Sequence, residues 1–148
     1  MLCRGFLLGG TSGRTTLNGE GPQHQDGHSQ IVANTVPNLR SYDPAFAYEL
    51  AVIIRDGIQR MYANQEEVFY YITIHNQNYP MPPMPAGCAD GIVQGMYCFR
   101  RSGKTPMKGR KAHLFGSGAI MSEVLAAAEM LEQVGERVRG VLALVAAE

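Results

Sequence analysis

The sequence predicts an α/β protein, a parallel sheet with flanking helices, because two helix and strand combinations stand out along its 148 residues. In the first, an amphipathic helix over about Pro44–Met61 precedes Val68–Ile74, a continuous run of β-branched and aromatic residues. A run without alternation predicts a strand buried on both faces, as in a parallel sheet covered by helices. In the second, a strand over His113–Phe115 leads through Gly116-Ser117-Gly118 into another helix. Strand, glycine turn and helix in this order form a βα unit.

The first helix is predicted to begin at Asp43-Pro44, since Asp can accept from the free amides of the first turn and Pro has no amide to lose. Apolar residues then recur at spacings of three and four, which predicts one buried stripe. The stripe consists of Phe46, Leu50, Ile53, Ile54, Ile58 and Met61. The last helix carries a similar stripe from Ile120 to Val134, and Gly135 stands at its expected C-cap position.

The remaining segments connect these units. Glycines interrupt both periods between Gly5 and Gly27, which predicts a loop shaped against a ligand or a neighbouring segment. Tyr79–Pro85 contains four prolines and is predicted to be extended. A short helix is expected around Ala86–Gly95, and Arg100–Arg110 has the composition of a linker. The chain is thus predicted to join the last part of one α/β domain to the first part of another.

Composition excludes several classes of protein. Thirteen Lys and Arg balance thirteen Asp and Glu, so the chain lacks the basic excess that nucleic acid or anionic membranes require, and we expect neither partner. The longest apolar stretch, Val141–Ala147, is well short of the roughly 20 residues of a membrane-spanning helix. No secretory signal pattern is present at the N-terminus. Cys3, Cys88 and Cys98 are odd in number without CxxC spacing, which favours reduced thiols in the cytoplasm over disulfides or zinc.

The densest polar cluster, Asn18–His28, contains Glu20, His24, Asp26 and His28. Its glycines let the main chain approach a ligand, and histidine can move protons near neutral pH or donate to a developing oxyanion. We interpret the cluster as a functional loop. A solvated loop held by its own side chains is the structural alternative, and a small metal-binding module using His24, Asp26 and His28 is a further functional one.

His75 directly follows the buried strand, where ligands gather at the carboxyl ends of parallel strands. A single histidine in such a position is usually a structural residue with satisfied hydrogen bonds, and we expect that here. The glycines at positions 9 to 13 resemble a phosphate loop only in composition, because neither the GxGxxG pattern nor the following lysine is present. Cys88 and Cys98 have no adjacent base, which disfavours a nucleophilic role.

The order of motifs from about Arg4 to Val134 resembles the homodimeric bacterial type of pyruvate dehydrogenase, the decarboxylating first component of the pyruvate dehydrogenase complex. The motifs are Arg4–Gly21, Gln23-His24, Asp26–Ser29, Ser41–Ala45, Arg60–Tyr62, Tyr70–Thr73, Asn78-Tyr79, Met81-Pro82, Met84-Pro85 and Gly116–Gly118. Such a long ordered series is specific to that family.

The resemblance implies an acetyl-transferring pyruvate dehydrogenase that uses thiamine diphosphate and magnesium, acts on pyruvate and passes acetyl groups to a lipoyl-bearing acetyltransferase component. It implies a cytoplasmic homodimer related to transketolase, with the cofactor between the diphosphate-binding domain of one subunit and the pyrimidine-binding domain of the other. Residues 1–101 then correspond to part of the pyrimidine-binding domain, 102–110 to a linker and 111–148 to the truncated start of the C-terminal domain.

The same resemblance implies roles for the polar loop. His24 lies by the reacting carbon of the cofactor and Glu20 in the same pocket, and both are expected to be catalytic. Their chemistry suits these roles, since the substrate carboxylate and developing alkoxide need a cationic donor and a nearby carboxylate can set the protonation of the histidine. Asp26 and His28 are expected to support the substrate loop. The alternative, with His28 as the chemical residue and His24 as scaffold, stays open.

Several features depart from the family pattern. Gln25 and Gln30 stand where Glu and His are expected, and Pro80 where His or a small residue is frequent. The metal-and-diphosphate motif, a Gly-Asp-Gly followed further along by Asn, is absent from the sequence, and the Glu that activates the aminopyrimidine is expected upstream of Met1. After Val134 the sequence resembles a frame-shifted or truncated reading frame. We therefore expect the isolated chain to be inactive, and the alternative function is a non-catalytic truncated or frame-shifted gene product.

Overall fold

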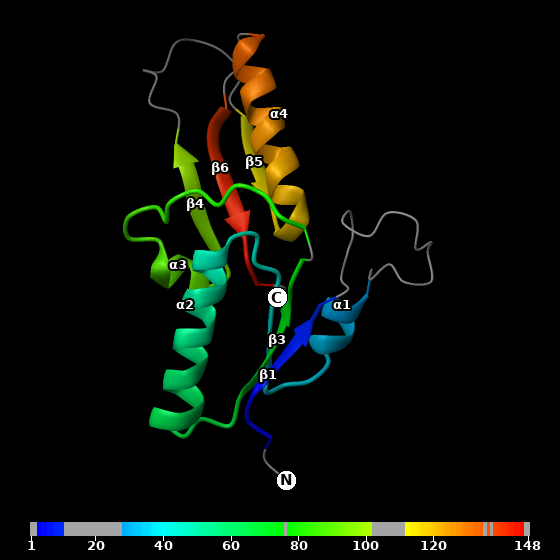
Figure 1. Ribbon diagram of the computed structural model, residues 1–148, viewed down its shortest axis with the longest axis vertical. Coiled ribbons are helices and arrows are strands. Elements are labelled where there is room, and N and C mark those ends of the chain that lie inside the picture. The colour runs from blue at the N-terminus through cyan, green and yellow to red at the C-terminus, as the bar shows by residue number, and fades with distance from the viewer. Residues whose placement is uncertain are drawn as a thin grey trace.

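The computed structural model describes residues 3–10, 28–75, 77–101, 112–134, 136 and 138–146, which form two three-stranded sheets with helices (Figure 1). The strands are β1 (Phe6–Gly9), β2 (Leu39–Tyr42), β3 (Phe69–Thr73), β4 (Met96–Arg101), β5 (Ala112–Gly116) and β6 (Val138–Leu144). The helices are α1 (Ser29–Ala33), α2 (Ala47–Ile58), α3 (Ala89–Val93) and α4 (Met121–Gln133), with a π-helical turn at Gln59–Ala63 and a 3-10 turn at Gly118–Ile120. Within these ranges, no helix is long and apolar enough to cross a membrane.

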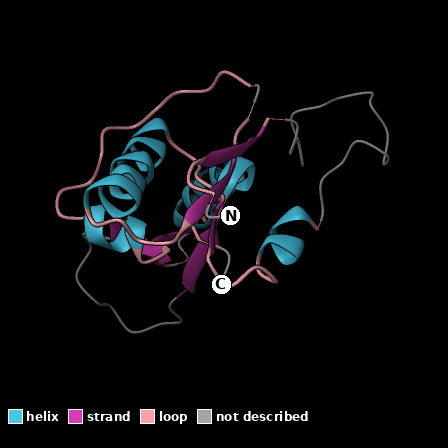
Figure 2. Cartoon of the chain, turned by 90° about the horizontal axis from the view of Figure 1, so that it is seen from below, coloured by secondary structure: helices cyan, strands magenta, loops and turns pink. Residues whose placement is uncertain are grey.

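The first sheet is parallel in the order β1-β3-β2, so the predicted buried strand lies at its centre. Tyr70 and Ile72 of β3 are fully buried. Helix α2 packs against this sheet so closely that a Cβ on Gly57 would lie 2.7 Å from the ring of Phe6. Helix α1 lies on the other side of the strands from α2, as two perpendicular views show (Figures 1 and 2). The predicted parallel sheet with flanking helices is confirmed.

Two strands of this sheet differ from the sequence prediction. The segment that begins at Gly5 was expected to be a loop, yet Phe6–Gly9 pairs with β3 over four residues. Strand β2, Leu39–Tyr42, had no predicted counterpart because its sequence mixes polar and apolar residues. Both strands are too short to show a period of their own, and pairing with the central strand β3 determines their conformation.

Helix α2 begins three residues later than the Asp43-Pro44 signal predicts, at Ala47. The backbone amides of Ala45 and Phe46 donate to the Glu49 carboxylate at 2.5 and 3.0 Å, so Glu49 satisfies the free amides at this helix terminus. The carboxylate of Asp43 instead accepts a hydrogen bond from the hydroxyl of Thr73 in β3. The predicted helix is therefore present, but its capping residue was assigned wrongly.

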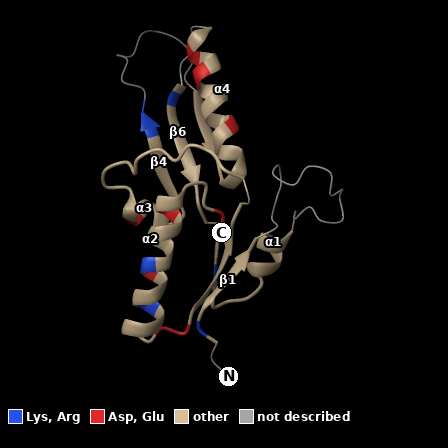
Figure 3. Cartoon of the chain, in the orientation of Figure 1, with Lys and Arg blue, Asp and Glu red and all other residues tan. Residues whose placement is uncertain are grey.

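The second sheet has the order β4-β6-β5, with β6 antiparallel to β4 and parallel to β5. Arg100 and Arg101, predicted from composition to start a linker, are the last residues of β4. Arg100 lies 3.5 Å from Glu132 of α4, a helix that carries acidic residues along its length (Figure 3). Strands on both sides of the segment 102–110 thus share one sheet, and the division into domains around that segment stays a prediction.

The tail after Val134 forms the middle strand of this second sheet. Val141 and Ala143 of β6 are 0% and 1% exposed, so the strand is an integral part of the core. The sequence predicted only that this tail departs from the family pattern and resembles a frame-shifted or truncated reading frame. Its apolar run, Val141–Ala147, nevertheless has the length and hydrophobicity of a buried strand.

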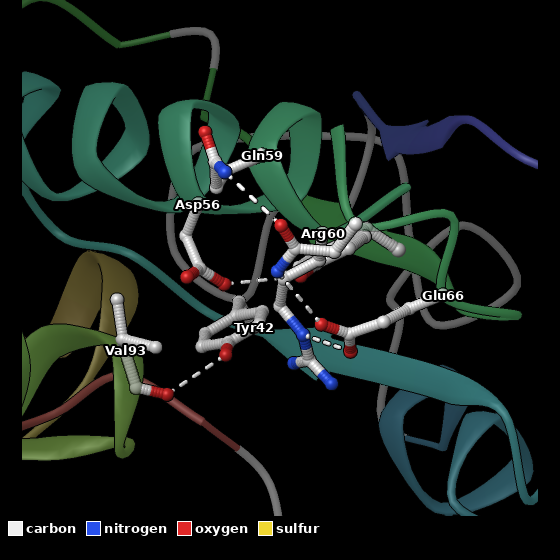
Figure 4. Close-up of polar contacts among 8 residues, drawn as sticks. Tyr42, Asp56, Gln59, Arg60, Glu66 and Val93 are labelled. Atoms are coloured by element: carbon white, nitrogen blue, oxygen red, sulfur yellow. Dashed lines mark hydrogen bonds and ion pairs between the residues drawn. The ribbon is translucent and has the colours of Figure 1, made fainter. Parts of the chain in front are cut away.

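The two sheets meet where β2 and β6 end. The Asp43 amide donates to the Val145 carbonyl at 2.7 Å, and the Gly118 amide donates to the Asp43 carbonyl at 3.1 Å. The Tyr42 hydroxyl donates to the carbonyl of Val93 at 2.9 Å, a contact visible in the close-up of Figure 4. Asp43 therefore joins the first sheet to β6 and to the turn before α4.

This junction predicts a large effect for Gly118→Ala. Gly118 has φ of +46°, and a Cβ there would lie 2.5–2.7 Å from the carboxylate of Asp43, which is itself tethered to Thr73. We expect a loss of about 2–4 kcal/mol in the free energy of unfolding, measured by urea denaturation. Gly87→Ala is the matched control, since Gly87 has φ of +72° but no atom within 4 Å of the added Cβ. Equal losses in the two variants would show that backbone strain alone, and not the contact with Asp43, is responsible.

The amino end of the first sheet carries a separate polar cluster (Figure 4). Arg60 Nε donates to Glu66 Oε2 at 2.7 Å, and the hydroxyl of the buried Tyr70 donates to Asp56 Oδ2 at 3.1 Å. These contacts tie the π-helical turn and α2 to β3. The cluster lies where the strands of this sheet begin. The predicted functional loop follows β1 at the opposite end of the sheet.

Candidate functional site

The three parallel strands of the first sheet end at Gly9, Tyr42 and Thr73, and we call this side of the sheet the carboxyl edge. Ligands of open α/β sheets bind at such edges, outside the carboxyl ends of the strands. The predicted functional loop follows β1 directly. The Ile74 amide donates to the Gly9 carbonyl at 3.1 Å, and a Cβ on Gly10 would lie 3.8 Å from Cδ1 of Ile74. The loop therefore leaves the sheet beside the residues that follow β3.

Most polar side chains described at the carboxyl edge have hydrogen-bond partners within the protein. The Thr73 hydroxyl donates to Asp43 Oδ1 at 2.5 Å, and both residues are buried. The Ser41 hydroxyl donates to Gln30 Oε1, and Gln30 Nε2 donates to the carbonyl of Tyr42 at 3.3 Å. These hydrogen bonds hold the strand ends and α1 together, so the groups that form them already have partners within the protein.

His75, two residues beyond the end of β3, is the exception. Both of its ring nitrogens are buried, and neither has a hydrogen-bond partner in the described part of the chain. The expectation of a structural histidine with satisfied hydrogen bonds is therefore not met by protein groups in the described part of the chain. A buried polar group left unpaired destabilises the fold by about 1–3 kcal/mol, so its presence at a ligand-binding edge needs an explanation.

The residues predicted to be catalytic, Glu20 and His24, lie outside the described residues, as does Asp26. Their roles stay predictions. His28 is described: it is exposed and precedes α1, and its carbonyl accepts from the amide of Val32 at 3.0 Å. Among the described residues no three His, Cys, Asp or Glu side chains gather in a way that could hold a metal ion. The metal-binding alternative depends on His24 and Asp26 and is not tested by that finding.

A second buried polar cluster was not predicted from the sequence. Glu49 of α2 is fully buried, and it accepts a hydrogen bond of 2.6 Å from the hydroxyl of Tyr97 in β4, which also hydrogen-bonds the Tyr48 hydroxyl. Burial raises the pKa of Glu49, and hydrogen bonds from Tyr97 and from the amides of Phe46 and Ala45 offset part of that rise. Burial also raises the pKa of Tyr97 and of Tyr48. The cluster joins α2 to β4 of the second sheet, and its one sequence signal is a Glu at the third helical position.

Two other features of the structure do not belong to the site. Burial raises the pKa of the Cys88 thiol, which agrees with the prediction that it is not a nucleophile. A pocket lies along the outer side of β2, between Asn34 and Ala146, and it does not include His75.

The comparison with solved structures defines the class of fold. A transketolase from Pichia stipitis matches with a TM-score of 0.70 and 18% identity, over 96% of this chain and 19% of that chain. The transketolase from Campylobacter jejuni matches with a TM-score of 0.67 and 19% identity, over 95% of this chain and 20% of that chain. The fold is α/β of the transketolase type, as predicted.

Sequence comparison gives the family. The model of the pyruvate dehydrogenase E1 component middle domain matches residues 1–82. The pyruvate dehydrogenase E1 component of Cupriavidus necator is 56% identical over 133 residues, which are 90% of this chain and 15% of that protein. The E1 component of Escherichia coli K12 is 58% identical over 129 residues, 86% of this chain and 14% of that protein. The chain belongs to the pyruvate dehydrogenase E1 component family, and it spans about 15% of the length of these relatives.

Proposed function

We propose that this chain forms the substrate-facing part of a pyruvate dehydrogenase E1 component. The proposed reaction is the thiamine-diphosphate-dependent oxidative decarboxylation of pyruvate, with transfer of the acetyl group to lipoyl groups of the acetyltransferase component. The observation that supports it most strongly is the match of residues 1–82 to the middle domain of that family. The proposal includes a homodimeric, cytoplasmic enzyme that links glycolysis to acetyl-CoA.

The residues of this chain suit one end of the cofactor only. Thiamine diphosphate, when bound, supplies the electron sink for decarboxylation. The sequence contains no Gly-Asp-Gly motif, and among the described residues no cluster could hold magnesium. The chain therefore does not fit the diphosphate and its metal, which we assign to another part of the enzyme. At the carboxyl edge, the ring nitrogens of His75 are buried and have no hydrogen-bond partner among the described residues.

The proposed roles follow from the charges that develop on pyruvate. His24 donates to the substrate carboxylate and to the oxygen that gains negative charge, and Glu20 sets the protonation of His24. Asp26 and His28 order the loop that carries them. The position of Gly10 beside Ile74 supports this proposal, because the loop starts at the edge where ligands of such sheets bind.

A grafted enzyme tests the proposed function. In it, residues 4–134 of this chain replace the matching segment of the Escherichia coli relative, which is 58% identical. We expect pyruvate-dependent reduction of an artificial electron acceptor that requires added thiamine diphosphate. A folded, dimeric graft without any thiamine-dependent rate would contradict the proposal and favour the alternative of a non-catalytic gene product.

A further inference from the structure

We propose that Glu49, Tyr97 and Tyr48 form a pH-dependent switch between α2 and β4, in which proton uptake by the carboxylate reverses a row of hydroxyl hydrogen bonds. The Tyr97 hydroxyl donates to Glu49 Oε1 at 2.6 Å, and it also hydrogen-bonds the Tyr48 hydroxyl. The three side chains thus form one continuous row of oxygen atoms, which we call the hydroxyl row. The row lies outside the predicted functional loop, and the proposal does not depend on the proposed function.

The hydroxyl row leads from the protein interior toward the surface. Glu49 is 0% exposed and Tyr97 is 5% exposed, whereas Tyr48 is partly exposed. The rings of Tyr48 and Tyr97 meet edge to face with centroids 6.4 Å apart, and the ring of Phe46 stacks on Tyr48. These aromatic contacts hold the two hydroxyl groups in position. Glu49 can therefore exchange a proton with water through the two hydroxyls, although it is itself fully buried.

Hydrogen bonding determines which oxygen of Glu49 takes up the proton. Oε2 accepts from the amides of Ala45 and Phe46 at 2.5 and 3.0 Å, so a proton on Oε2 would point at two other donors. Oε1 instead faces the Tyr97 hydroxyl, which can accept a hydrogen bond as well as donate one. The added proton therefore lies on Oε1, at the inner end of the hydroxyl row.

Protonation of Oε1 reverses the row without moving a side chain. With Glu49 ionised, Tyr48 donates to Tyr97 and Tyr97 donates to the carboxylate. During proton uptake, hydronium gives a proton to the Tyr48 oxygen, Tyr48 passes its own proton to Tyr97, and Tyr97 passes its own to Oε1. Each O–H bond that breaks is replaced by a new one, so both tyrosines end neutral. Glu49 then donates to Tyr97, Tyr97 donates to Tyr48, and Tyr48 donates to water.

The groups around Glu49 favour its protonated form. The titratable side chains that act on it from the neighbouring segments are Asp43, Tyr48, Tyr79, Cys88 and Tyr97. None of these five groups carries a positive charge that could stabilise the carboxylate. Burial raises the pKa of Glu49, and the nearby Asp43 carboxylate adds to that rise. The contact between α2 and β4 is therefore strongest while Glu49 is protonated, and it weakens as pH rises through the raised pKa.

The hydroxyl row predicts opposite effects for its two tyrosines. Tyr97→Phe removes a donor to the ionised carboxylate, so the pKa of Glu49 should rise. Tyr48→Phe removes the acceptor that Tyr97 needs when Glu49 is protonated, so the pKa of Glu49 should fall. The unpaired O–H outweighs the lost polarisation of the ionised row, which is only a fraction of one hydrogen bond. A carboxylate that titrates independently of the row predicts no change in Tyr48→Phe, because the Tyr48 hydroxyl bonds to Tyr97.

The test follows the titration of Glu49 in the 148-residue chain by infrared difference spectroscopy, with Glu49→Gln identifying its carboxyl band. We expect the midpoint to shift upward by about one pH unit in Tyr97→Phe and downward by about one pH unit in Tyr48→Phe, which is the effect of one hydrogen-bond partner. Tyr62→Phe is the control, because Tyr62 is 54% exposed and outside the hydroxyl row, and it should leave the midpoint unchanged.

Urea denaturation across the same pH range gives a second measurement of these signs. Stability relative to Glu49→Gln falls as pH rises toward the folded pKa, and this fall should end at a higher pH in Tyr97→Phe and at a lower pH in Tyr48→Phe. Shifts in the same direction in both variants, or an unchanged midpoint in Tyr48→Phe, would overturn the switch. A Glu49 that stays ionised below its ordinary value of 4.5 would overturn it as well, because the row would not reverse in the folded chain.

Discussion

His24→Ala in the grafted enzyme is expected to lower kcat for pyruvate decarboxylation by about two to three orders of magnitude. The proposed imidazole donates a hydrogen bond that strengthens as negative charge develops, so its loss acts mainly on the transition state. The affinity for thiamine diphosphate should change little, because the diphosphate and its metal are assigned to another part of the enzyme. Steady-state kinetics with an artificial electron acceptor measure the decarboxylation alone.

His28→Ala is the matched variant, four residues further along the same loop. His28 lies exposed before α1, and its carbonyl accepts from the amide of Val32, a contact that the side-chain substitution leaves in place. We expect a smaller loss of kcat than in His24→Ala, of about tenfold or less, from reduced order in the loop. Equal losses in the two variants, or a larger one in His28→Ala, would contradict the assignment of His24 as the chemical residue.

Glu49→Ala is expected to produce the largest loss of stability, about 3–5 kcal/mol in the free energy of unfolding. The carboxylate accepts from the amides of Ala45 and Phe46 and from the hydroxyl of Tyr97, and Glu49 is 0% exposed. Truncation leaves the two amides without their acceptor where water does not reach, at about 1–3 kcal/mol for each group that stays unpaired, and the Tyr97 hydroxyl keeps only its hydrogen bond with Tyr48. Urea denaturation followed by circular dichroism measures the loss. A change below about 1 kcal/mol would show that these hydrogen bonds do not stabilise the contact between α2 and β4.

Glu49→Gln separates the charge of this residue from its hydrogen bonds. The amide oxygen can still accept from Ala45 and Phe46, and its NH₂ group can donate to the oxygen of Tyr97, so we expect a loss of about 1 kcal/mol or less at low pH. Burial raises the pKa of Glu49 above its ordinary value of 4.5 in the folded chain. The unfolded chain therefore loses this proton first as pH rises.

The sign of the pH dependence follows from that difference. Between 4.5 and the raised pKa, the folded chain binds more protons than the unfolded one, so the contribution of Glu49 to stability falls as pH rises. The stability of the unsubstituted chain relative to Glu49→Gln should be highest near pH 4 and lower at pH 8. A relative stability that increases over this range would mean that the folded pKa is depressed instead.

Long and strongly patterned elements were predictable from the sequence. The continuous apolar run ending at Ile74 forms the central strand β3, and the helical stripes around Ile53 and Val124 correspond to α2 and α4. Two residues of the predicted α2 stripe differ in burial: Met61 is fully buried, whereas Ile58 is 50% exposed at the end of the helix. Periodicity thus located the elements, but it did not show which residues of a stripe the rest of the fold covers.

Short elements and polar side chains were not predictable in the same way. Strands β1 and β2 have four residues each, and only their pairing with β3 distinguishes them from loop. Asp43 has the sequence context of a helix cap, yet its carboxylate accepts from Thr73, a residue 30 positions away. Such choices depend on partners distant in sequence, which local patterns do not contain.

The candidate site, like the fold, was predictable from the sequence only in part. The sequence placed His75 at a ligand-binding edge because it follows a buried strand, and the structure confirms that position. The sequence could not show that neither of its nitrogens has a partner among the described residues, because hydrogen bonding depends on the surrounding elements. Glu20 and His24 were assigned from motif resemblance, and their roles remain proposals.

A crystal structure of the grafted enzyme with thiamine diphosphate and an unreactive pyruvate analogue tests the central claim most directly. The account predicts that the carboxyl edge of the first sheet faces the pyrimidine side of the cofactor. It further predicts that a ring nitrogen of His24 lies within hydrogen-bonding reach of the analogue, about 3 Å or one bridging water. A structure in which the analogue binds away from this edge, with His24 out of reach, would contradict it.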